Sequence, residues 1–309
     1  MSIRSIKEMS DFELVIPGSG ACAGCPSTIA LRIVGKALGP NSVMLMTPSC
    51  AVASIGLLPK TCYDLPVQNI CFAAAGASGG GASSAFDVLY RKGKIPDKPI
   101  VFNWTGDGGT YDIGFQGISA AAERNDDYIQ FCYNNEAYSN TGVQRSGATP
   151  RYALTTNTPL GKETGKKNMP LLMLDHQIPY VATASLAYPM DLYRKVEKAK
   201  SIKGFRYIEI LAPCYPGWKF EASQTIQYSR LAVKSKAWLL WEAEDGNVTF
   251  NSPTKQILEG KVPPIPLNDY LEGQGRFKHI FKNPDKAEIL KQMEVDIETG
   301  IRLMLQKTK

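Results

Sequence analysis

The pattern of apolar and polar positions divides most of the chain into short strands and longer helical segments. Apolar runs rich in β-branched and aromatic residues occur at 43–46, 100–102, 128–131, 180–182 and 207–211. Runs of this length and composition favour β-strands. The stretches 27–38, 83–92, 113–124 and 190–203 have the spacing of helices instead. Because near-continuous apolar strands alternate with helices, the pattern predicts an α/β fold with a mostly parallel sheet and helices on both faces.

The pattern changes from residue 251 onward. Prolines at 253, 263, 264 and 266 indicate an extended segment, and 284–307 has the pattern of a polar terminal helix. We therefore expect two regions, a sheet domain at 1–250 and a C-terminal arm and helix at 251–309. The apolar and aromatic residues of the arm favour packing on the domain or on a partner subunit over a free disordered tail.

Composition narrows the class of protein. The 309 residues are 44% hydrophobic and 21% charged, values typical of a globular domain. The net charge of +6 is spread along the chain, which gives nucleic-acid binding no support. No apolar stretch is long enough for a membrane span, and the first residues lack the apolar core of a secretory signal. We therefore expect a cytoplasmic protein.

A glycine-rich segment directly follows the strand at 100–102 and has the composition of a phosphate site. It reads Gly106-Asp107-Gly108-Gly109. Glycines let backbone N–H groups approach phosphate oxygens, and a helix that begins near residue 113 adds its positive end. A diphosphate alone does not need Asp107, but a Mg²⁺ ion that bridges the phosphates does. The segment therefore predicts a phosphate and metal site at the carboxyl end of a strand.

A second set of oxygen ligands follows the strand at 128–131 and consists of Asn134, Asn135, the Ala137 carbonyl and Asn140. Asn135 comes 28 residues after Asp107. A strand–helix–strand crossover needs about this span to return to the neighbouring strand end, so the spacing places Asp107 and Asn135 side by side. The alternative to a shared phosphate and metal site is that the two segments are ordinary turns rich in Gly and Asn.

Seven cysteines in a chain without an export signal point to thiols that are buried, catalytic or metal-bound. Cys22 and Cys25 form a CxxC loop before the helix at 27–38, while Cys50 and Cys214 each lie just beyond a strand end. Four thiolates at one sheet edge suit zinc or a cubane iron–sulfur cluster, and one pair with two distant single cysteines is more typical of a cluster. We expect the remaining cysteines to pack as small hydrophobic residues: Cys62, Cys71 and Cys132.

The oxygen ligands and the four cysteines together make residues 15–220 resemble the β subunit of the 2-oxoacid:ferredoxin oxidoreductases, of the pyruvate type. The matching motifs are the CxxC, Cys50, GDGGTYDIG (106–114), NNEAYSNTG (134–142), QRSGATP (144–150) and PCYPGW (213–218). The resemblance implies a thiamine-diphosphate-binding fold that also holds one [4Fe–4S] cluster in the domain at 1–250. One departure is that Gly18-Ser19 and Pro26 replace the Gly-His pair and the Gly that often flank the CxxC.

The resemblance also assigns roles to metal ligands. It implies that the cluster ligands are Cys22, Cys25, Cys50 and Cys214. It implies that Mg²⁺ is bound by the Asp107 and Asn135 side chains and the Ala137 carbonyl.

The remaining roles concern thiamine diphosphate itself. Asn140 is expected to contact the diphosphate and face the reacting carbon, and Phe72 either stacks on the pyrimidine or is a plain core residue. Further residues expected around the cofactor are Gly106, Gly108, Gly109, Thr110, Thr141 and Cys50.

The activity that the resemblance implies is oxidative decarboxylation of a small 2-oxoacid such as pyruvate, or of oxalate to CO₂. Electrons would pass one at a time through the cluster to ferredoxin, and coenzyme A is a possible co-substrate. The implied partners are subunits of the α, γ and δ type in a dimer of heterotrimers or heterotetramers, and they would complete the active site. Two alternatives stay open: a non-oxidative thiamine decarboxylase or carboligase, and a zinc-stabilised module without catalysis.

Overall fold

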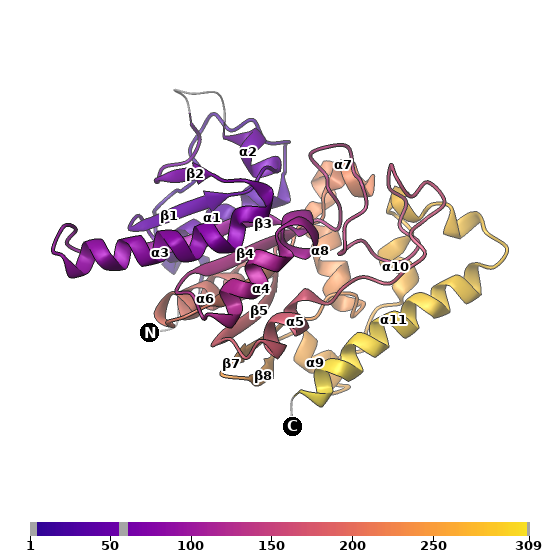
Figure 1. The fold of residues 1–309 in the computed structure, drawn as a ribbon. Helices are drawn as coiled ribbons and strands as arrows, with labels where there is room; N and C mark the ends of the chain where they lie inside the picture. The colour runs from indigo at the N-terminus through magenta and orange to yellow at the C-terminus, as the bar shows by residue number, and fades with distance from the viewer. Residues whose placement is uncertain (1–4, 56–60, 308–309) are drawn as a thin grey trace.

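A central sheet of eight strands organises the computed structural model, which describes residues 5–55 and 61–307. The strand order is β2-β1-β3-β4-β6-β5-β7-β8, and all pairs are parallel except those made by β7 (Figure 1). The strands are β1 (Ser42–Met46), β2 (Val67–Asn69), β3 (Ile100–Gly106), β4 (Ile129–Asn134), β5 (Tyr180–Ser185), β6 (Arg206–Leu211), β7 (Trp241–Glu244) and β8 (Asn247–Phe250). The predicted mostly parallel sheet is confirmed, and its five predicted strands are β1, β3, β4, β5 and β6.

Helices cover both faces of the sheet. The α-helices are α1 (Pro26–Leu38), α2 (Cys50–Ser54), α3 (Ala75–Arg91), α4 (Phe115–Glu123), α5 (Met169–Asp175), α6 (Pro189–Ser201), α7 (Tyr215–Trp218), α8 (Thr225–Lys234), α9 (Thr254–Leu258), α10 (Leu267–Leu271) and α11 (Lys286–Gln306). Short helical turns of other types are η1 (Ile6–Glu8), η2 (Phe72–Ala74), η3 (Gly108–Ile113), η4 (Ala222–Gln224), η5 (Gly275–Phe277) and η6 (Ile280–Lys282).

Side chains that alternate along the strands build two apolar cores, one on each face. Phe102 and Phe131 pack on the face that α1 and α6 cover. Val101 and Cys132 point to the opposite face, which α3, α4 and α5 cover. Both faces of β4 and β6 are therefore buried, and this explains why these strands read as continuous apolar runs.

The helix α3 begins at Ala75, eight residues before the predicted start. Its first half is rich in glycine, which lets it pack closely against α4. A Cβ atom built on Gly76 would lie 1.9 Å from the Gly117 carbonyl oxygen. Glycine has no side chain to add to an apolar pattern, so the periodicity of the sequence does not show this part of the helix. The close contact of α3 with α4 holds α4 against the sheet, directly after β3 and η3 in the chain.

We expect the substitution Gly76→Ala to lower the free energy of unfolding by about 3 kcal/mol or more, because the new methyl group would overlap a backbone carbonyl. The matched control is Gly81→Ala on the same helix, where a Cβ atom meets nothing within 4 Å. Alanine is the better helix former, so this control should gain about 0.5–1 kcal/mol. Urea unfolding of the two variants measures the difference, and equal stabilities would contradict the packing described.

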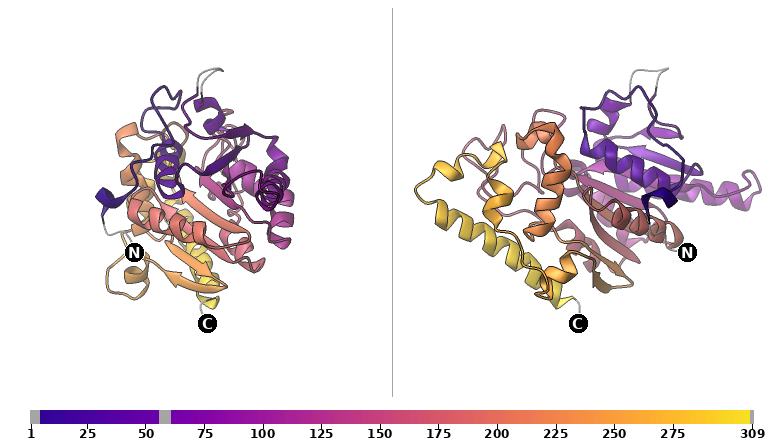
Figure 2. Two further views of the ribbon diagram at one scale, coloured as in Figure 1. Left: turned by 90° about the vertical axis from the view of Figure 1, so that its left-hand side faces the viewer. Right: turned by 180° about the vertical axis from the view of Figure 1, so that it is seen from behind.

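The C-terminal helices gather on the side of the molecule opposite the tip of α3 (Figure 2). They share a third apolar core, which includes Trp218, Tyr228, Trp238, Tyr270, Phe277 and Met293. The predicted terminal helix is α11, but the prediction of a wholly extended segment between the prolines is wrong, because α9 lies within it. The hydroxyl of Thr254 at the start of α9 accepts a hydrogen bond from the Leu240 N–H and ties this turn to the body. The division of the chain at residue 250 stays a prediction.

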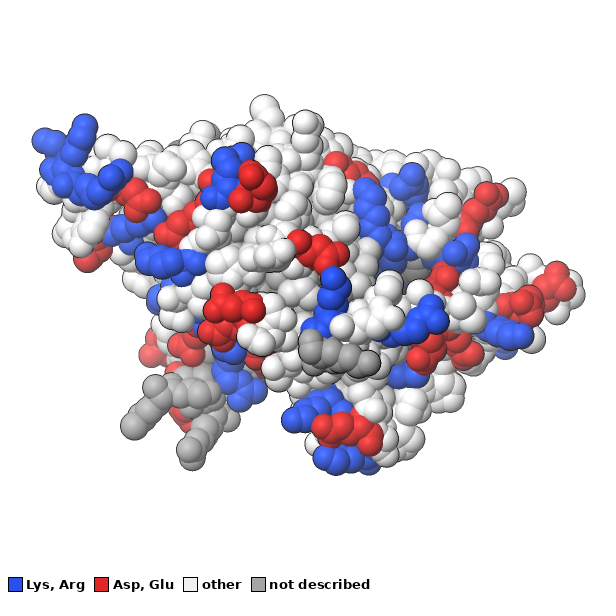
Figure 3. All heavy atoms as spheres, turned by 60° about the horizontal axis from the view of Figure 1, so that its bottom comes forward, with Lys and Arg blue, Asp and Glu red and all other residues white. Residues whose placement is uncertain are grey.

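The surface shows no dominant charge on the face drawn in Figure 3, where Lys and Arg lie among Asp and Glu. The net charge of +6 is therefore not concentrated in one basic surface there. Among the helices of the described residues, none combines the length and the apolar character that crossing a membrane requires.

Candidate functional site

The carboxyl ends of β3 and β4 bring the two predicted oxygen clusters together. The parallel register pairs Gly106 with Tyr133, so the residues that follow each strand are neighbours. The Asn135 N–H donates to Asp107 Oδ1 at 3.3 Å, which confirms the predicted contact between these residues. Asp107 is fully buried, and this burial raises the pKa of its carboxyl group to about 8. A buried carboxylate of this kind favours a cation as its partner.

The Asn135 amide provides a test of whether the site suits Mg²⁺. One of its terminal atoms lies 2.6 Å from the Ala137 carbonyl oxygen and 3.0 Å from Asp107 Oδ1. If that atom is the nitrogen, it donates to both oxygens. If it is the oxygen, it lies against two other acceptor oxygens, an arrangement that a bound cation stabilises. In either orientation the Asn135 amide lies within 3.0 Å of the Ala137 carbonyl and the Asp107 carboxylate, and a set of oxygen groups of this kind is compatible with Mg²⁺.

Glycine at position 108 lets an aromatic ring close over the start of η3. A Cβ atom on Gly108 would lie 2.2 Å from Cε1 of Tyr138. The hydroxyl of Tyr138 donates to the Gly108 carbonyl at 3.1 Å. Since η3 is a π-helical turn, its geometry is one that occurs often at functional sites. The tight contact keeps the backbone at the end of β3 in one position relative to the loop that follows β4.

A cavity of about 70 Å³ lies at this edge of the sheet. The predicted residues that line it are Cys50, Phe72, Gly106, Asp107, Gly108, Gly109, Asn135, Ala137, Asn140 and Thr141. Thr110 is not among them, because its hydroxyl donates to the Gly106 carbonyl at 2.9 Å and contacts Thr105 Oγ1 at 2.7 Å inside the protein. Ligand sites usually measure about 300 Å³ or more, so this chain forms only part of a cofactor site.

The four predicted cluster ligands come from three segments that meet beside this cavity. Cys50 begins α2 beyond β1 and lines the cavity, while Cys214 directly precedes α7. The loop of Cys22 and Cys25 is fastened to α2 by the Gly20 N–H, which donates to the Ser54 carbonyl at 3.0 Å.

Burial, together with the charges of the nearby Cys214, Cys25 and Cys22 thiolates, raises the pKa of the Cys50 thiol to about 12, as expected for four thiols that lie near one another. In the part of the chain that the structure describes, no three side chains of His, Cys, Asp or Glu are gathered as a single metal ion requires. In a cubane cluster each thiolate binds a different iron, so its ligands lie farther apart than those of one ion.

The remaining cysteines differ from one another. Cys62 and Cys132 are fully buried, as predicted for packing residues. The same prediction for Cys71 is wrong, because this thiol is exposed beyond the edge strand β2.

Comparison with known proteins identifies the family. Residues 59–210 match the thiamine pyrophosphate enzyme, C-terminal TPP binding domain. The PorB subunit of pyruvate synthase from Methanothermobacter marburgensis is 41% identical over 90% of this chain and 93% of its own length. The VorB subunit of ketoisovalerate oxidoreductase from Pyrococcus abyssi is 39% identical over 89% of this chain and 88% of its own length. The chain is a 2-oxoacid:ferredoxin oxidoreductase β subunit.

A solved structure supports the fold of this β subunit. It is a 2-oxoglutarate:ferredoxin oxidoreductase from Magnetococcus marinus, with a TM-score of 0.56 and 19% identity over 72% of this chain and 82% of that one. At this level of identity the likeness shows the fold alone.

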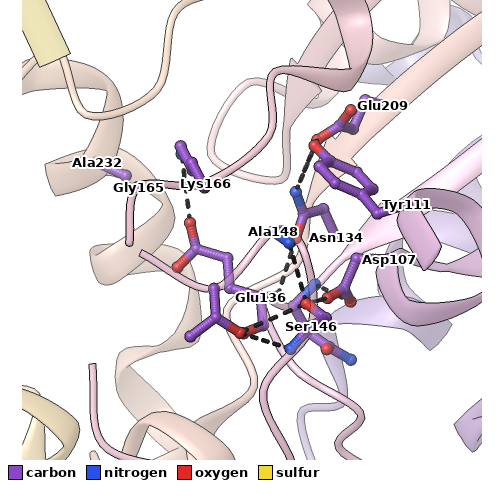
Figure 4. A network of polar contacts seen from close by, with 12 residues as sticks. Asp107, Tyr111, Asn134, Glu136, Ser146, Ala148, Gly165, Lys166, Glu209 and Ala232 are labelled. Carbon is purple, nitrogen blue, oxygen red and sulfur yellow. Dashed lines mark hydrogen bonds and ion pairs between the residues drawn. The ribbon is translucent and has the colours of Figure 1, made fainter. Parts of the chain in front are cut away.

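Two residues of the β subunit that sequence reasoning left without a role, Ser146 and Thr149, support the oxygen ligands (Figure 4). Ser146 Oγ donates to Asp107 Oδ2, and the Ser146 N–H donates to Thr149 Oγ1 at 2.9 Å. Thr149 Oγ1 in turn donates to the Glu136 carbonyl at 2.6 Å. The motif QRSGATP contains both Ser146 and Thr149, so its match to the family was the feature of the sequence that could have pointed to these two residues.

Asn134 stabilises the turn after β4. Its Oδ1 accepts from the Glu136 N–H at 2.9 Å, and its amide nitrogen donates to the buried Glu209 at 2.7 Å. Since both polar ends of the side chain have protein partners, Asn134 supports the turn from inside and does not belong to the set of oxygen ligands. Burial raises the pKa of Glu209, and hydrogen bonds from Tyr111, Asn134 and Tyr207 oppose that shift.

Proposed function

We propose that this β subunit binds the diphosphate end of Mg²⁺–thiamine diphosphate in the cavity between η3 and residues 135–141, and holds a [4Fe–4S] cluster beside it. The observation that carries the proposal is that one cavity is lined both by Cys50 and by Asp107 and Asn135. A cluster ligand and the metal ligands of the cofactor therefore share one sheet edge. Such proximity is what transfer of single electrons from cofactor to cluster requires.

Each part of the cavity has a chemical task in this proposal. Bound thiamine diphosphate supplies a nucleophilic carbon and an electron sink. Asp107, the Asn135 side chain and the Ala137 carbonyl would hold Mg²⁺, and the backbone of Gly108 and Gly109 would meet the phosphates. Asn140 and Thr141 line the cavity from the loop after β4, where Asn140 would meet the diphosphate and the reacting carbon. Phe72 lines it from η2 and would stack on the pyrimidine.

The remainder of the site would come from partner subunits of the α, γ and δ type, in a cytoplasmic dimer of heterotrimers or heterotetramers. The small size of the cavity supports this, since it accommodates only one end of the cofactor. Ferredoxin is the acceptor that the family uses, and the cluster on Cys22, Cys25, Cys50 and Cys214 would be the first carrier on the way to it. Membership of this family gives no support to the carboligase and zinc-module alternatives.

Pyruvate is the substrate that we propose, with coenzyme A as co-substrate, because the PorB relatives are named pyruvate synthase subunits. The VorB relatives have nearly the same identity to this chain, so a branched 2-oxoacid is the nearest competitor. The altered CxxC loop keeps oxalate on the panel of substrates to test. Ser19 Oγ there accepts from the Ala21 N–H at 3.2 Å, and Pro26 begins α1.

Reduction of a viologen dye by the complex, purified anaerobically with its partner subunits, tests the proposal. We expect reduction with pyruvate only when coenzyme A is present. Reduction with oxalate in the absence of coenzyme A would identify oxalate, and not pyruvate, as the substrate. No reduction with any 2-oxoacid, from a complex shown to contain thiamine diphosphate and iron, would overturn the proposed function.

A further inference from the structure

A strained residue lies between two of the proposed Mg²⁺ ligands. Glu136 has a φ of 62°, in the left-handed region that non-glycine residues rarely adopt. It connects Asn135, whose side chain is one ligand, to Ala137, whose carbonyl is another. Such strain persists only where the surrounding structure fixes it. The contacts of Glu136 therefore determine whether the two ligands stay in place.

The side chain of Glu136 turns away from Asp107 and toward basic residues (Figure 4). Its Oε2 lies 2.7 Å from Nη2 of Arg276 in η5, and both side chains are 4% exposed. Lys166 Nζ lies 3.5 Å from the other carboxylate oxygen. Removal of Arg276 would leave the buried Glu136 carboxylate with only the more distant and partly exposed Lys166, so the pair with Arg276 is the main charge contact of the strained turn.

The same arginine also contacts the loop of a proposed cluster ligand. Its guanidinium carbon lies 3.6 Å from the centroid of the Trp218 ring. The Trp218 indole N–H donates to the Asn135 carbonyl at 2.8 Å, and the Trp218 backbone N–H donates to the Cys214 carbonyl at 2.7 Å. Trp218 therefore links the loop of Cys214 to the turn of Asn135, and Arg276 covers its ring.

Arg276 itself is fixed by contacts on both sides. Its Nε donates to Gln274 Oε1 at 2.9 Å, and its carbonyl accepts from the Leu154 N–H at 2.9 Å. It is 3% exposed and lies in the C-terminal region, about 140 residues after Asn135 in the sequence.

We propose that Arg276 is a positioning residue, through which the C-terminal region holds the Mg²⁺ ligands and the Cys214 loop in one arrangement. The inference rests on the proposed function, since it concerns the same ligands. Without Arg276 the turn at Glu136 keeps its hydrogen bonds to Asn134 and Thr149 but loses the ion pair that holds its side chain, so the oxygens of Asn135 and Ala137 are held together less firmly. The affinity for the cofactor then falls although no group that touches it has been changed.

The test is the affinity of the cofactor-stripped complex for thiamine diphosphate in the presence of Mg²⁺, measured by titration calorimetry. We expect Arg276→Met to raise the Kd by about 10–100-fold, the usual effect of losing a residue that orients metal ligands. Arg276→Lys keeps the charge but loses the planar contact with Trp218, so it should show an intermediate loss. Glu136→Gln combined with Arg276→Met should be no weaker than Arg276→Met alone, because both changes break the same pair.

The matched control is Asp296→Asn, which breaks another ion pair between the C-terminal region and the body. Asp296 in α11 lies 2.7 Å from Arg151 Nε and contacts neither Glu136 nor Trp218. We expect this variant to change the Kd by less than about twofold. An unchanged Kd in Arg276→Lys, or equal Kd values for Arg276→Met and Asp296→Asn, would overturn the proposal. Failure of the wild-type complex to bind thiamine diphosphate would instead refute the proposed function.

Discussion

Replacing Cys50 with serine should remove about four iron atoms per β subunit from the complex and abolish electron transfer from the 2-oxoacid to the dye, because a cubane cluster needs its four thiolates. Cys50 is the cysteine that also lines the cofactor cavity, so its loss affects the part of the cluster that faces the cofactor. Thiamine diphosphate should still bind, since the proposed Mg²⁺ ligands lie just beyond the ends of β3 and β4 and not in the cysteine loops. Iron analysis and dye reduction by the anaerobically purified complex measure the two effects.

The control for this prediction is Cys71→Ser, which removes another thiol of the same chain. Cys71 is exposed and lies outside the four converging cysteines. Its replacement should leave the iron content unchanged. A Cys50→Ser complex with its full iron content would show that the ligand set has been assigned wrongly, and an equal loss from both variants would point to general instability of the cluster.

The sequence predicted the strands whose side chains are buried on both faces of the sheet. The central strands are apolar on both faces, and their runs are visible without any knowledge of their neighbours. The edge strands β2 and β8, and β7 next to β8, are short and partly exposed, so their pattern does not differ from that of loops. The prolines of the C-terminal region led to the opposite error, because Pro253 directly precedes α9, a helix that the sequence did not reveal.

The candidate site could be predicted only where chain geometry fixes it. The crossover between two neighbouring parallel strands sets the contact of Asp107 with Asn135, and this needs only their spacing. Thr110 shows the limit, since the turn of η3 directs its hydroxyl inward and not to the cavity. Arg276 was beyond prediction, because its contact with Glu136 depends on how the C-terminal helices pack against the sheet.

Replacing Asp107 with asparagine should have opposite effects on the cofactor-free and cofactor-bound protein. The carboxylate is fully buried, and its burial raises the pKa to about 8, so it opposes folding when no cation is present. Asparagine keeps an oxygen for the Ser146 hydroxyl but carries no charge. The cofactor-free variant should therefore be at least as stable as the wild type, while its affinity for Mg²⁺ and thiamine diphosphate should fall by about a thousandfold, or about 4 kcal/mol.

Thermal unfolding with and without Mg²⁺ and thiamine diphosphate separates this prediction from a general loss of structure. A ligand present at a hundred times its Kd stabilises the wild type by about 2.7 kcal/mol, and this gain should vanish in Asp107→Asn. Asp191→Asn is the contrasting control, because it leaves Lys195, which is 2% exposed, without its carboxylate partner at 2.6 Å. That variant should be less stable without cofactor but keep the full gain. Equal gains in Asp107→Asn and the wild type would mean that the metal lies elsewhere. A metal bound by the Asp107 carboxylate would bind the variant too weakly to stabilise it.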